Sequence, residues 1–550
     1  MCDYTPSKRG QRRRPKESDP SPRNLASRAS PFYIPESSTW DSAVADLDTP
    51  LESLGTIHAT AQPTQSAAPT VQDNSITQDS NTLPSATWFD DEQLVSLFYL
   101  NFHTSHPILV PKSLYGKRGY PRCVKAVVEF IGSQFSTNNS SDTLRNIAAR
   151  EIECGKQEIP EMVQARTLFT IALFARNEID DGSRMLVRAT DIAIGLGMHK
   201  QDFAAQYAKN SAAEEESMRK TWYELFVVDG CIAAFQRKSS FKTNSVNADV
   251  ILPCDDGIND GETYPCVTAT RADFESSIFS DQDMVFSSSC YRIEAVRLLG
   301  RVLAIAGAHG VHRDRVQAID NALAAFIHHL PSCKSQPEII NTYGELDELM
   351  FQTHLIIQYA TILLHFPRSD LTSPAAFTNV VPGTNSAKLV CPCNHQRIHS
   401  IKAIDASKTL SMLAALRSPV HRHTPFFIWT LALGATVQLA VSAMHSKSSR
   451  NCLEEHCDRV KLMLGVLKSC SRYWFTAKVV LRALNRMALP VFEPLRQGLP
   501  KTTAQQDEVM GGDLEACIYE TPTSAPPWPE DFDFQNIQEL IGFDTNDFCL

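Results

Sequence analysis

Apolar residues return every three or four positions through most of the middle of this chain. In the stretch RMLVRATDIAIGLGMHK, this spacing places four apolar side chains on one face of a predicted helix, namely Met185, Ala189, Ile192 and Leu196. Gly195 and Gly197 close this segment instead of following a strand, so they favour a helix end over a dinucleotide-binding turn. Alternating strand patterns with Asn-Gly or Asp-Gly turns are scarce.

The first helix of this kind is predicted in WFDDEQLVSLFYLNF, where Asp90 or Asp91 can cap its start. Its apolar face carries Leu94, Phe98 and Phe102, and the helix is expected to stop before Pro107. Helical periodicity then continues to about residue 490, with polar interruptions near 255–285 and 369–397. We therefore predict an all-α, multi-helix domain over residues 88–490.

The regions on either side of this domain differ from it in composition and in charge. Residues 17–87 are rich in Ser, Thr, Pro, Gln and Asp, which predicts a disordered linker because few large apolar side chains are available to offset the entropy of ordering. Residues 1–16 include the basic run KRGQRRRPK, whereas no lysine or arginine follows Lys501. Residues 491–550 are accordingly predicted to be a disordered acidic tail.

Composition narrows the class of protein. The chain has 550 residues, 43% of them hydrophobic, which is enough for a large core, and its formal net charge of -10 argues against bulk attraction to nucleic acid. No uninterrupted apolar run approaches the roughly 20 residues of a membrane-spanning helix. We expect no membrane partner, and we expect most of the fifteen cysteines to be buried as small hydrophobic residues.

Motifs of catalysis are scarce. The sequence has no G-x-S-x-G elbow, no phosphate-binding loop and no H-E-x-x-H pair, so no enzyme is predicted. An alternative is a cytosolic all-α metalloprotein or enzyme that binds zinc through the cluster CPCNHQRIH, with Cys391, Cys393, His395 and His399 as ligands. The single residue between the two cysteines is shorter than structural zinc sites use, which favours a polar loop that enters a helix near His399.

One predicted helix places a carboxylate among core residues. In EEESMRKTWYELFVVDGCIAAFQRK, helical spacing puts Asp229 on the face of Trp222, Leu225 and Ile232. A buried carboxylate needs a cationic or hydrogen-bonding partner. We favour a structural ion pair with an arginine such as Arg188 or Arg237 over a contact with a ligand or coregulator in a groove.

Four segments resemble, in this order, the middle regulatory domain of fungal transcription factors of the binuclear zinc cluster family: LFYLNFHTSHPIL, ARTLFTIALFARNEIDDGSRMLVRATDIAIGLGMHK, RKTWYELFVVDGCIAAFQRK and ILPCDD. The distal segments IKAIDASKTLSMLAALRSPVHRHTPFFIWTLALGATVQLA and VLKSCSRYWFTAKVVLRALNRMA are similar to the second half of that domain. The resemblance implies a nuclear transcriptional regulator, of a pathway or of a gene cluster for secondary metabolites. One departure is Gly230, where the family often has arginine.

The resemblance also gives a meaning to Cys2. In that family six cysteines hold two zinc ions, and the last cysteine leads into a tail much like YTPSKRGQRRR. Cys2 resembles this sixth ligand, and one thiolate cannot hold two metals, so we expect no cofactor in the chain as written and zinc only if the other cysteines are supplied. The expectation is either a truncated product or a regulator without its own DNA-reading module, which would reach DNA through a partner factor.

The basic run has two expected roles. As a lysine and arginine cluster beside a flexible linker, it suits recognition by a nuclear import receptor, and it could equally contact DNA phosphates without reading sequence. The residues concerned are Lys8, Arg9, Arg12, Arg13, Arg14 and Lys16. A solvated charge run without function is the remaining interpretation. Nuclear localisation is the prediction, and a homodimer is among the assemblies considered.

The acidic tail interleaves carboxylates with large apolar side chains, a pattern typical of activation segments that bind transcriptional coactivators. The apolar residues concerned are Trp528, Phe532, Phe534, Leu540 and Phe543. A docking helix is predicted over residues 534–543. The alternatives are a C-terminal helix packed on the middle domain, and a corepressor that acts through the middle domain alone and lacks its own DNA-binding module.

Overall fold

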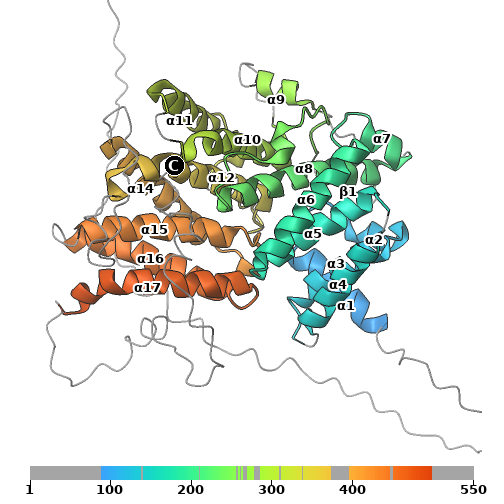
Figure 1. Cartoon of the computed structure of the whole chain (residues 1–550), viewed down its shortest axis with the longest axis horizontal. Coiled ribbons are helices and arrows are strands. Elements are labelled where there is room, and N and C mark those ends of the chain that lie inside the picture. Colours follow the sequence, from blue (N-terminus) through green and yellow to red (C-terminus); the bar gives the residue numbers. More distant parts are fainter. Residues whose placement is uncertain are drawn as a thin grey trace, which may run out of the picture. The chain divides into compact units, whose positions relative to one another are not determined.

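A computed structural model describes residues 88–497, apart from 138–139, 156, 210, 255–257, 260–261, 264–268, 278–284, 309–310, 337, 373–395 and 446–449. This part of the chain is all-α, as the apolar periodicity predicted (Figure 1). Its strands are the two-residue pair β1 (Ile258–Asn259) and β2 (Glu262–Thr263), which form one antiparallel hairpin.

The helices follow one another closely along the chain. The first half contains α1 (Trp88–Asn101), α2 (Lys112–Arg118), α3 (Arg122–Ser133), α4 (Ser141–Cys154), α5 (Pro160–Ala175), α6 (Ile179–Leu196), α7 (Phe203–Ala208), α8 (Ala212–Phe235), η1 (Lys242–Ser245) and α9 (Arg271–Ser277). The second half contains α10 (Ser288–Ala306), α11 (Arg313–His328), η2 (Ser332–Lys334), α12 (Glu348–His365), η3 (Phe366–Arg368), η4 (Asp370–Thr372), α14 (Gln396–Ala414), η5 (Val420–Arg422), α15 (Phe427–His445), α16 (Arg450–Cys470) and α17 (Phe475–Gln497).

The predicted helix faces are confirmed. Leu94, Phe98 and Phe102 are buried, and α1 ends at Asn101, ahead of Pro107. The helix already begins at Trp88, so Asp90 and Asp91 lie in its first turn and do not precede it.

The glycine-containing end of α6 is also as predicted. Ala189 and Ile192 are buried, and Met185 and Leu196 pack against the same core. Gly197 ends the helix with a φ of 76°, in the left-handed region that glycine adopts without a steric penalty.

Among the described residues of the polar stretch near 255–285, α9 is a helix that the sequence pattern did not predict. The short helix α9 lies within it, because Phe274 has apolar partners: its ring centroid is 4.9 Å from that of Phe286 and 5.5 Å from that of Tyr291. These partners lie outside the stretch itself. The polar stretch read by itself therefore does not reveal the apolar contacts that α9 makes.

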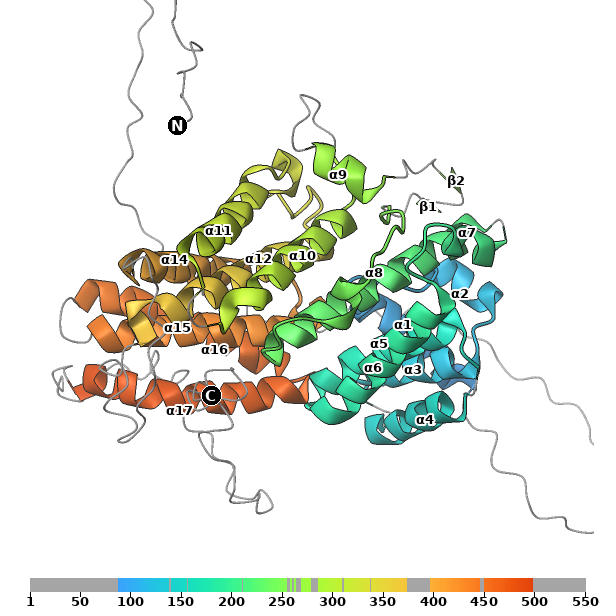
Figure 2. The same cartoon turned by 45° about the horizontal axis from the view of Figure 1, so that its top comes forward.

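Neighbouring helices pack in pairs around one continuous core. Contacts are densest between α5 and α6, between α10 and α12, and between α15 and α16, while α17 lies against both α15 and α16 (Figures 1 and 2). The helix α8 contacts α5, α6 and α10. It therefore links the helices of the first half of the domain to those of the second.

Two of these helices are long and apolar enough to cross a membrane by length and composition. They span Glu348–Arg368 and Phe427–Met444, within α12 and α15 and the turn after α12. However, the apolar stretches of these two helices are 83% and 89% buried within the protein. Their apolar character is explained by their position in the core, where a helix is hydrophobic on every side.

Close packing of α8 on α10 depends on two glycines. A β-carbon built on Gly230 would lie 2.5 Å from Cγ1 of Val296, and one on Gly300 would lie 3.1 Å from the ring of Phe241. Phe241 also lies 3.1 Å from the position of a β-carbon on Gly230. The two glycines thus leave the space that the Phe241 ring fills, and the arginine that the family often carries after Asp229 would not fit at Gly230.

We expect Gly230→Ala to destabilise the domain by about 1–3 kcal/mol, because the added methyl group overpacks a filled interface. Gly195→Ala is the matched control. Gly195 is an exposed helical position with no atom within 4 Å of an added β-carbon, so alanine there should be neutral or stabilising by up to about 1 kcal/mol. Urea denaturation followed by circular dichroism measures both, and equal midpoints for the two variants would contradict the packing argument.

Candidate functional site

A buried ion pair joins α8 to α10. Arg292 donates from Nη2 to Oε2 of Glu224, and both side chains are at most 4% exposed. Glu224 also accepts a hydrogen bond through Oε1 from Nδ1 of His106, at 2.7 Å. Burial alone would raise the pKa of Glu224, but Arg292 and His106 together hold that pKa below its ordinary value.

Two further elements complete this polar network. Nη1 of Arg292 donates to Oε1 of Gln352 in α12 at 2.8 Å and to the carbonyl oxygen of Ser105 at 3.3 Å. Nε2 of Gln352 donates to the same carbonyl oxygen at 2.9 Å. Hydrogen bonds inside the core therefore fix the relative positions of four segments that are far apart in the sequence.

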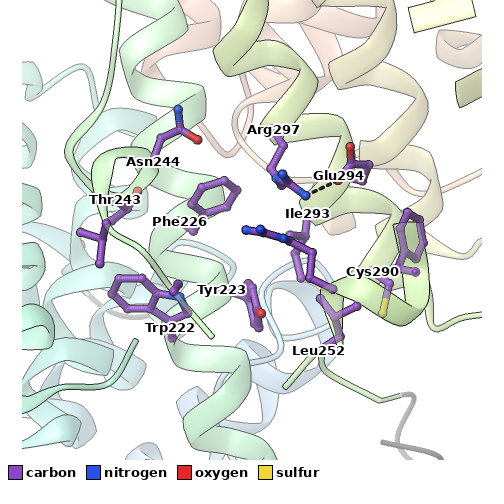
Figure 3. Close-up of a pocket in the computed structure, with 14 residues that line it drawn as sticks. Trp222, Tyr223, Phe226, Thr243, Asn244, Leu252, Cys290, Ile293, Glu294 and Arg297 are labelled. Carbon is purple, nitrogen blue, oxygen red and sulfur yellow. Dashed lines mark hydrogen bonds and ion pairs between the residues drawn. The ribbon is translucent and has the colours of Figure 1, made fainter. Parts of the chain in front are cut away.

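The same two helices line a cavity with other side chains. This cavity has a volume of about 140 Å³ and lies between α8, η1, α9 and α10 (Figure 3). Its aromatic wall consists of Trp222, Tyr223 and Phe226 from α8 and Phe274 from α9. Tyr223 and Phe226 lie on the same helix within two residues of Glu224, and the Tyr223 hydroxyl donates to the carbonyl oxygen of Val250 at 2.6 Å.

Charged groups occupy the opposite wall of the cavity. Arg297 donates to Glu294 at 3.0 Å, as Figure 3 shows, and to Glu275 at 3.0 Å. Arg271 lies 3.3 Å from the same Glu275 carboxylate. Burial raises the pKa of Glu294, and the nearby Glu275 raises it further, while Arg297 partly offsets both.

The cavity has room for a small organic molecule. A volume near 140 Å³ is comparable to cavities that accept a single six-membered ring. The aromatic wall offers apolar contact, and Asn244, Glu294 and the arginines offer polar contacts. The geometry supports a ligand site.

Asp229 shapes this cavity indirectly. Its Oδ2 accepts hydrogen bonds from the backbone nitrogen and from Oγ1 of Thr243, both at 2.9 Å, and Thr243 lines the cavity. The predicted burial of Asp229 is confirmed, at 9% exposure. The predicted arginine partner is wrong for Arg188, which pairs with Glu158 on the surface, because the loop after α8 folds back and supplies Thr243 instead. Burial raises the pKa of Asp229, and the hydrogen bonds from Thr243 limit that rise.

A second buried polar cluster contains His399, the residue that the metalloprotein alternative requires. His399 lies in α14, and its Nδ1 is 2.7 Å from Nδ1 of His365 in α12. Nε2 of His365 donates to Oδ1 of Asp320 in α11 at 3.1 Å, and Lys402 also donates to Asp320. Because Nε2 of His365 carries a proton, Nδ1 of its neutral ring accepts the hydrogen bond from His399.

These hydrogen bonds hold the side chain of His399 in the core. Cys391, Cys393 and His395 lie outside the described residues, and no group of three metal-binding side chains occurs within the part of the chain that the structure describes. The expected helix near His399 is confirmed by α14.

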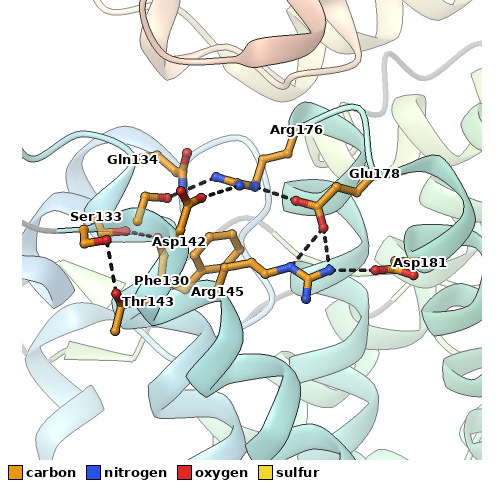
Figure 4. A network of polar contacts seen from close by, with 11 residues as sticks. Phe130, Ser133, Gln134, Asp142, Thr143, Arg145, Arg176, Glu178 and Asp181 are labelled. Carbon is orange, nitrogen blue, oxygen red and sulfur yellow. Dashed lines mark hydrogen bonds and ion pairs between the residues drawn. The ribbon is translucent and has the colours of Figure 1, made fainter. Parts of the chain in front are cut away.

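A third network ties α4 to α5 and α6 near the surface (Figure 4). Arg176 bonds Asp142 and Glu178, while Arg145 bonds Glu178 at 2.9 Å and Asp181 at 2.6 Å. The side chains are partly exposed, and such pairs contribute little individually. This network is best understood as a brace for the turn at Asn177, which has a positive φ of 64°.

The other predicted site residues lie outside the described residues. They are the zinc-ligand candidate Cys2, the basic residues Lys8, Arg9, Arg12, Arg13, Arg14 and Lys16, and the tail residues Trp528, Phe532, Phe534, Leu540 and Phe543. Conversely, sequence reasoning missed the Glu224–Arg292 pair and the cavity. The helical position of Glu224, beside the predicted core residue Leu225, was the available signal.

Comparison with known proteins agrees with the fold. Residues 95–343 match the family described as the fungal specific transcription factor domain. The chain is also 28% identical over 429 residues to the C6 finger domain transcription factor iacK of Pestalotiopsis fici, which covers 76% of this chain and 61% of that protein. No solved structure matches.

The match over residues 95–343 and the similarity to this relative confirm the resemblance predicted from the quoted segments. The family match contains both helices of the Glu224–Arg292 pair and every residue that lines the cavity. The chain spans about three fifths of the length of the relative.

The His365–His399 cluster predicts how stability depends on pH. Burial lowers the pKa of His399 to about 4, with His365 and Arg368 adding to the effect, and burial also lowers the pKa of His365. In the unfolded chain, histidine side chains have a pKa near 6.5. The two neutral histidines therefore contribute their full stabilisation above that pH, and the free energy of unfolding should fall as the pH drops toward 4. For His399 we expect a loss of about 2 kcal/mol, measured by urea denaturation between pH 7.5 and 4.5.

The variant His399→Gln tests this assignment, because its amide can still donate to His365 but does not titrate. The variant should lose stability less steeply with falling pH than the parent. His328→Gln, at an exposed position of α11, is the control and should keep the parent's dependence. A parent slope in His399→Gln would show that other groups cause the acid sensitivity.

Proposed function

We propose that this chain is a nuclear transcriptional regulator of fungal type. The observation that carries the proposal is the match of residues 95–343 to the fungal specific transcription factor domain. The name of the relative from Pestalotiopsis fici, a transcription factor, supports the same class. It would control the genes of a pathway or of a biosynthetic cluster for secondary metabolites.

In this proposal the flanking segments connect the domain to its partners. The basic run between Lys8 and Lys16 would bind a nuclear import receptor, and residues 513–550 would bind transcriptional coactivators through their aromatic side chains. Sequence-specific contact with DNA would come from a zinc cluster, either in the same protein or on a partner factor. The all-α domain between them would regulate this activity.

The metalloprotein alternative is less well supported. One of its four ligands, His399, already has a buried hydrogen-bond partner in His365. The corepressor alternative predicts the same middle domain, so only the tail distinguishes it from an activator.

A fusion of residues 513–550 to an unrelated DNA-binding domain tests the activator. We expect the fusion to raise transcription of a reporter at least about tenfold over the DNA-binding domain alone. Replacing Phe532, Phe534 and Phe543 with alanine should abolish the effect, because the acidic charge remains but the rings that insert into a coactivator groove are lost. A silent parent fusion at normal protein abundance would favour the corepressor.

Nuclear import is tested in the full chain. A fluorescent fusion in which the six basic residues between Lys8 and Lys16 are replaced by alanine should move from nucleus to cytoplasm, since a chain of 61.1 kDa enters the nucleus slowly without a receptor. The control replaces Arg313 and Arg315, two exposed cations of α11, and should remain nuclear. Unchanged import of the first variant would place the signal elsewhere in the chain.

A further inference from the structure

The two arginines in the wall of the cavity between α8, η1, α9 and α10 keep hydrogen-bond donors in reserve. Arg297 uses a single nitrogen, Nη1, to donate both to Glu294 and to Glu275, each at 3.0 Å. The contact of Arg271 with Glu275 is made by Nε, at 3.3 Å. Within the part of the chain that the structure describes, Nη2 of Arg297 and both Nη atoms of Arg271 donate to no acceptor.

The facing wall adds a buried donor. The side chain of Trp222 is 1% exposed and lines the cavity across from Arg297 and Glu294 (Figure 3). Its indole nitrogen donates to no acceptor among the described residues, whereas the neighbouring hydroxyl of Tyr223 donates to the backbone. A buried N–H group without a partner costs free energy, so the walls favour an occupant that accepts hydrogen bonds.

The charge of the lining is positive on balance. Its charged members are Arg271, Arg297 and the single carboxylate Glu294. Both arginines approach the same oxygen, Oε1 of Glu275, so their guanidinium groups are neighbours. Glu275 itself does not line the cavity and is 50% exposed, so water screens its charge.

A carboxylate matches this arrangement of donors and charge. Its two oxygens accept parallel hydrogen bonds from a planar guanidinium group, and such charged bonds are stronger than those between neutral groups. A cationic ligand is disfavoured, because Glu294 already accepts a hydrogen bond from Arg297 and the two arginines would repel a further cation.

The remainder of the cavity selects a flat apolar body. Its aromatic wall is formed by Trp222, Tyr223, Phe226 and Phe274, and rings pack on such walls in stacked or edge-to-face geometry. The volume of about 140 Å³ limits this body to about one six-membered ring. The cavity thus combines the space for one ring with donors for one anionic group.

We propose that this cavity binds a small aromatic carboxylate of about the size of benzoate. The carboxylate lies at Arg271 and Arg297, and the ring lies against the aromatic wall. Such a ligand touches α8, α9 and α10 at once, so its binding adds to the contacts that hold the short helix α9 on the domain. This binding does not depend on the proposed function of the chain.

Saturation-transfer NMR of the full chain tests the ligand class with four probes. Benzoate carries both the ring and the anion, benzyl alcohol keeps the ring without charge, benzylamine reverses the charge, and acetate lacks the ring. We expect a dissociation constant of about 1 mM or below for benzoate. The other three probes should bind at least about tenfold more weakly, because each loses the charged hydrogen bonds or the ring contacts.

Two variants locate the site. Arg271→Gln should weaken benzoate binding at least about tenfold and leave the binding of benzyl alcohol unchanged, because it removes charge but none of the aromatic wall. The Arg271 side chain is 53% exposed, so this variant should keep the melting temperature of the parent. Arg315→Gln, at an exposed position of α11, is the matched control and should bind benzoate as the parent does.

Four outcomes would overturn the proposal. Benzoate that shows no saturable binding up to about 10 mM would exclude the ligand class. Equal affinity for benzyl alcohol would make the cavity an apolar site only, and tighter binding of benzylamine would assign selectivity to Glu294. Unchanged benzoate affinity in Arg271→Gln would place the bound molecule elsewhere. The reporter fusion contains no part of the cavity, so a failure here is distinguishable from a failure of the proposed function.

Discussion

The buried pair of Glu224 and Arg292 is the constraint on which the arrangement of this domain depends. Two charges at most 4% exposed can remain ionised only if each has its partner, and removal of one typically costs about 3–5 kcal/mol. His106, Gln352 and the carbonyl oxygen of Ser105 form further hydrogen bonds with the pair. One rotation of α8 relative to α10 satisfies all of these contacts at once.

The rotation of α8 relative to α10 also determines which contacts the other faces of the two helices make. Gly230 and Gly300 face the ring of Phe241, and Tyr223 and Phe226 line the cavity with Ile293 and Glu294. Apolar packing tolerates small slips between helices, whereas a buried ion pair does not, because a displaced charge remains desolvated and unpaired. The Glu224–Arg292 pair does not line the cavity, but it joins two of the helices that do.

The surfaces of the domain have a different electrostatic character from its interior. Inside, each carboxylate in these networks has a donor, as Asp229 has Thr243 and Asp320 has His365. On α17, cations stand in a row at the surface, and residues 513–550 of the same chain have the opposite charge.

The sequence by itself determined the helical class, the buried faces of α1 and α6 and the end of α6 at Gly197, because these depend on local periodicity and backbone conformation. It also placed Asp229 among core residues and carried the family resemblance. It did not give the partner of Asp229, the helix α9 or the cavity. Those depend on which helices meet, and Glu224 and Arg292 are 68 residues apart. The local sequence shows that a buried charge needs a partner. Only the tertiary structure determines which residue that partner is.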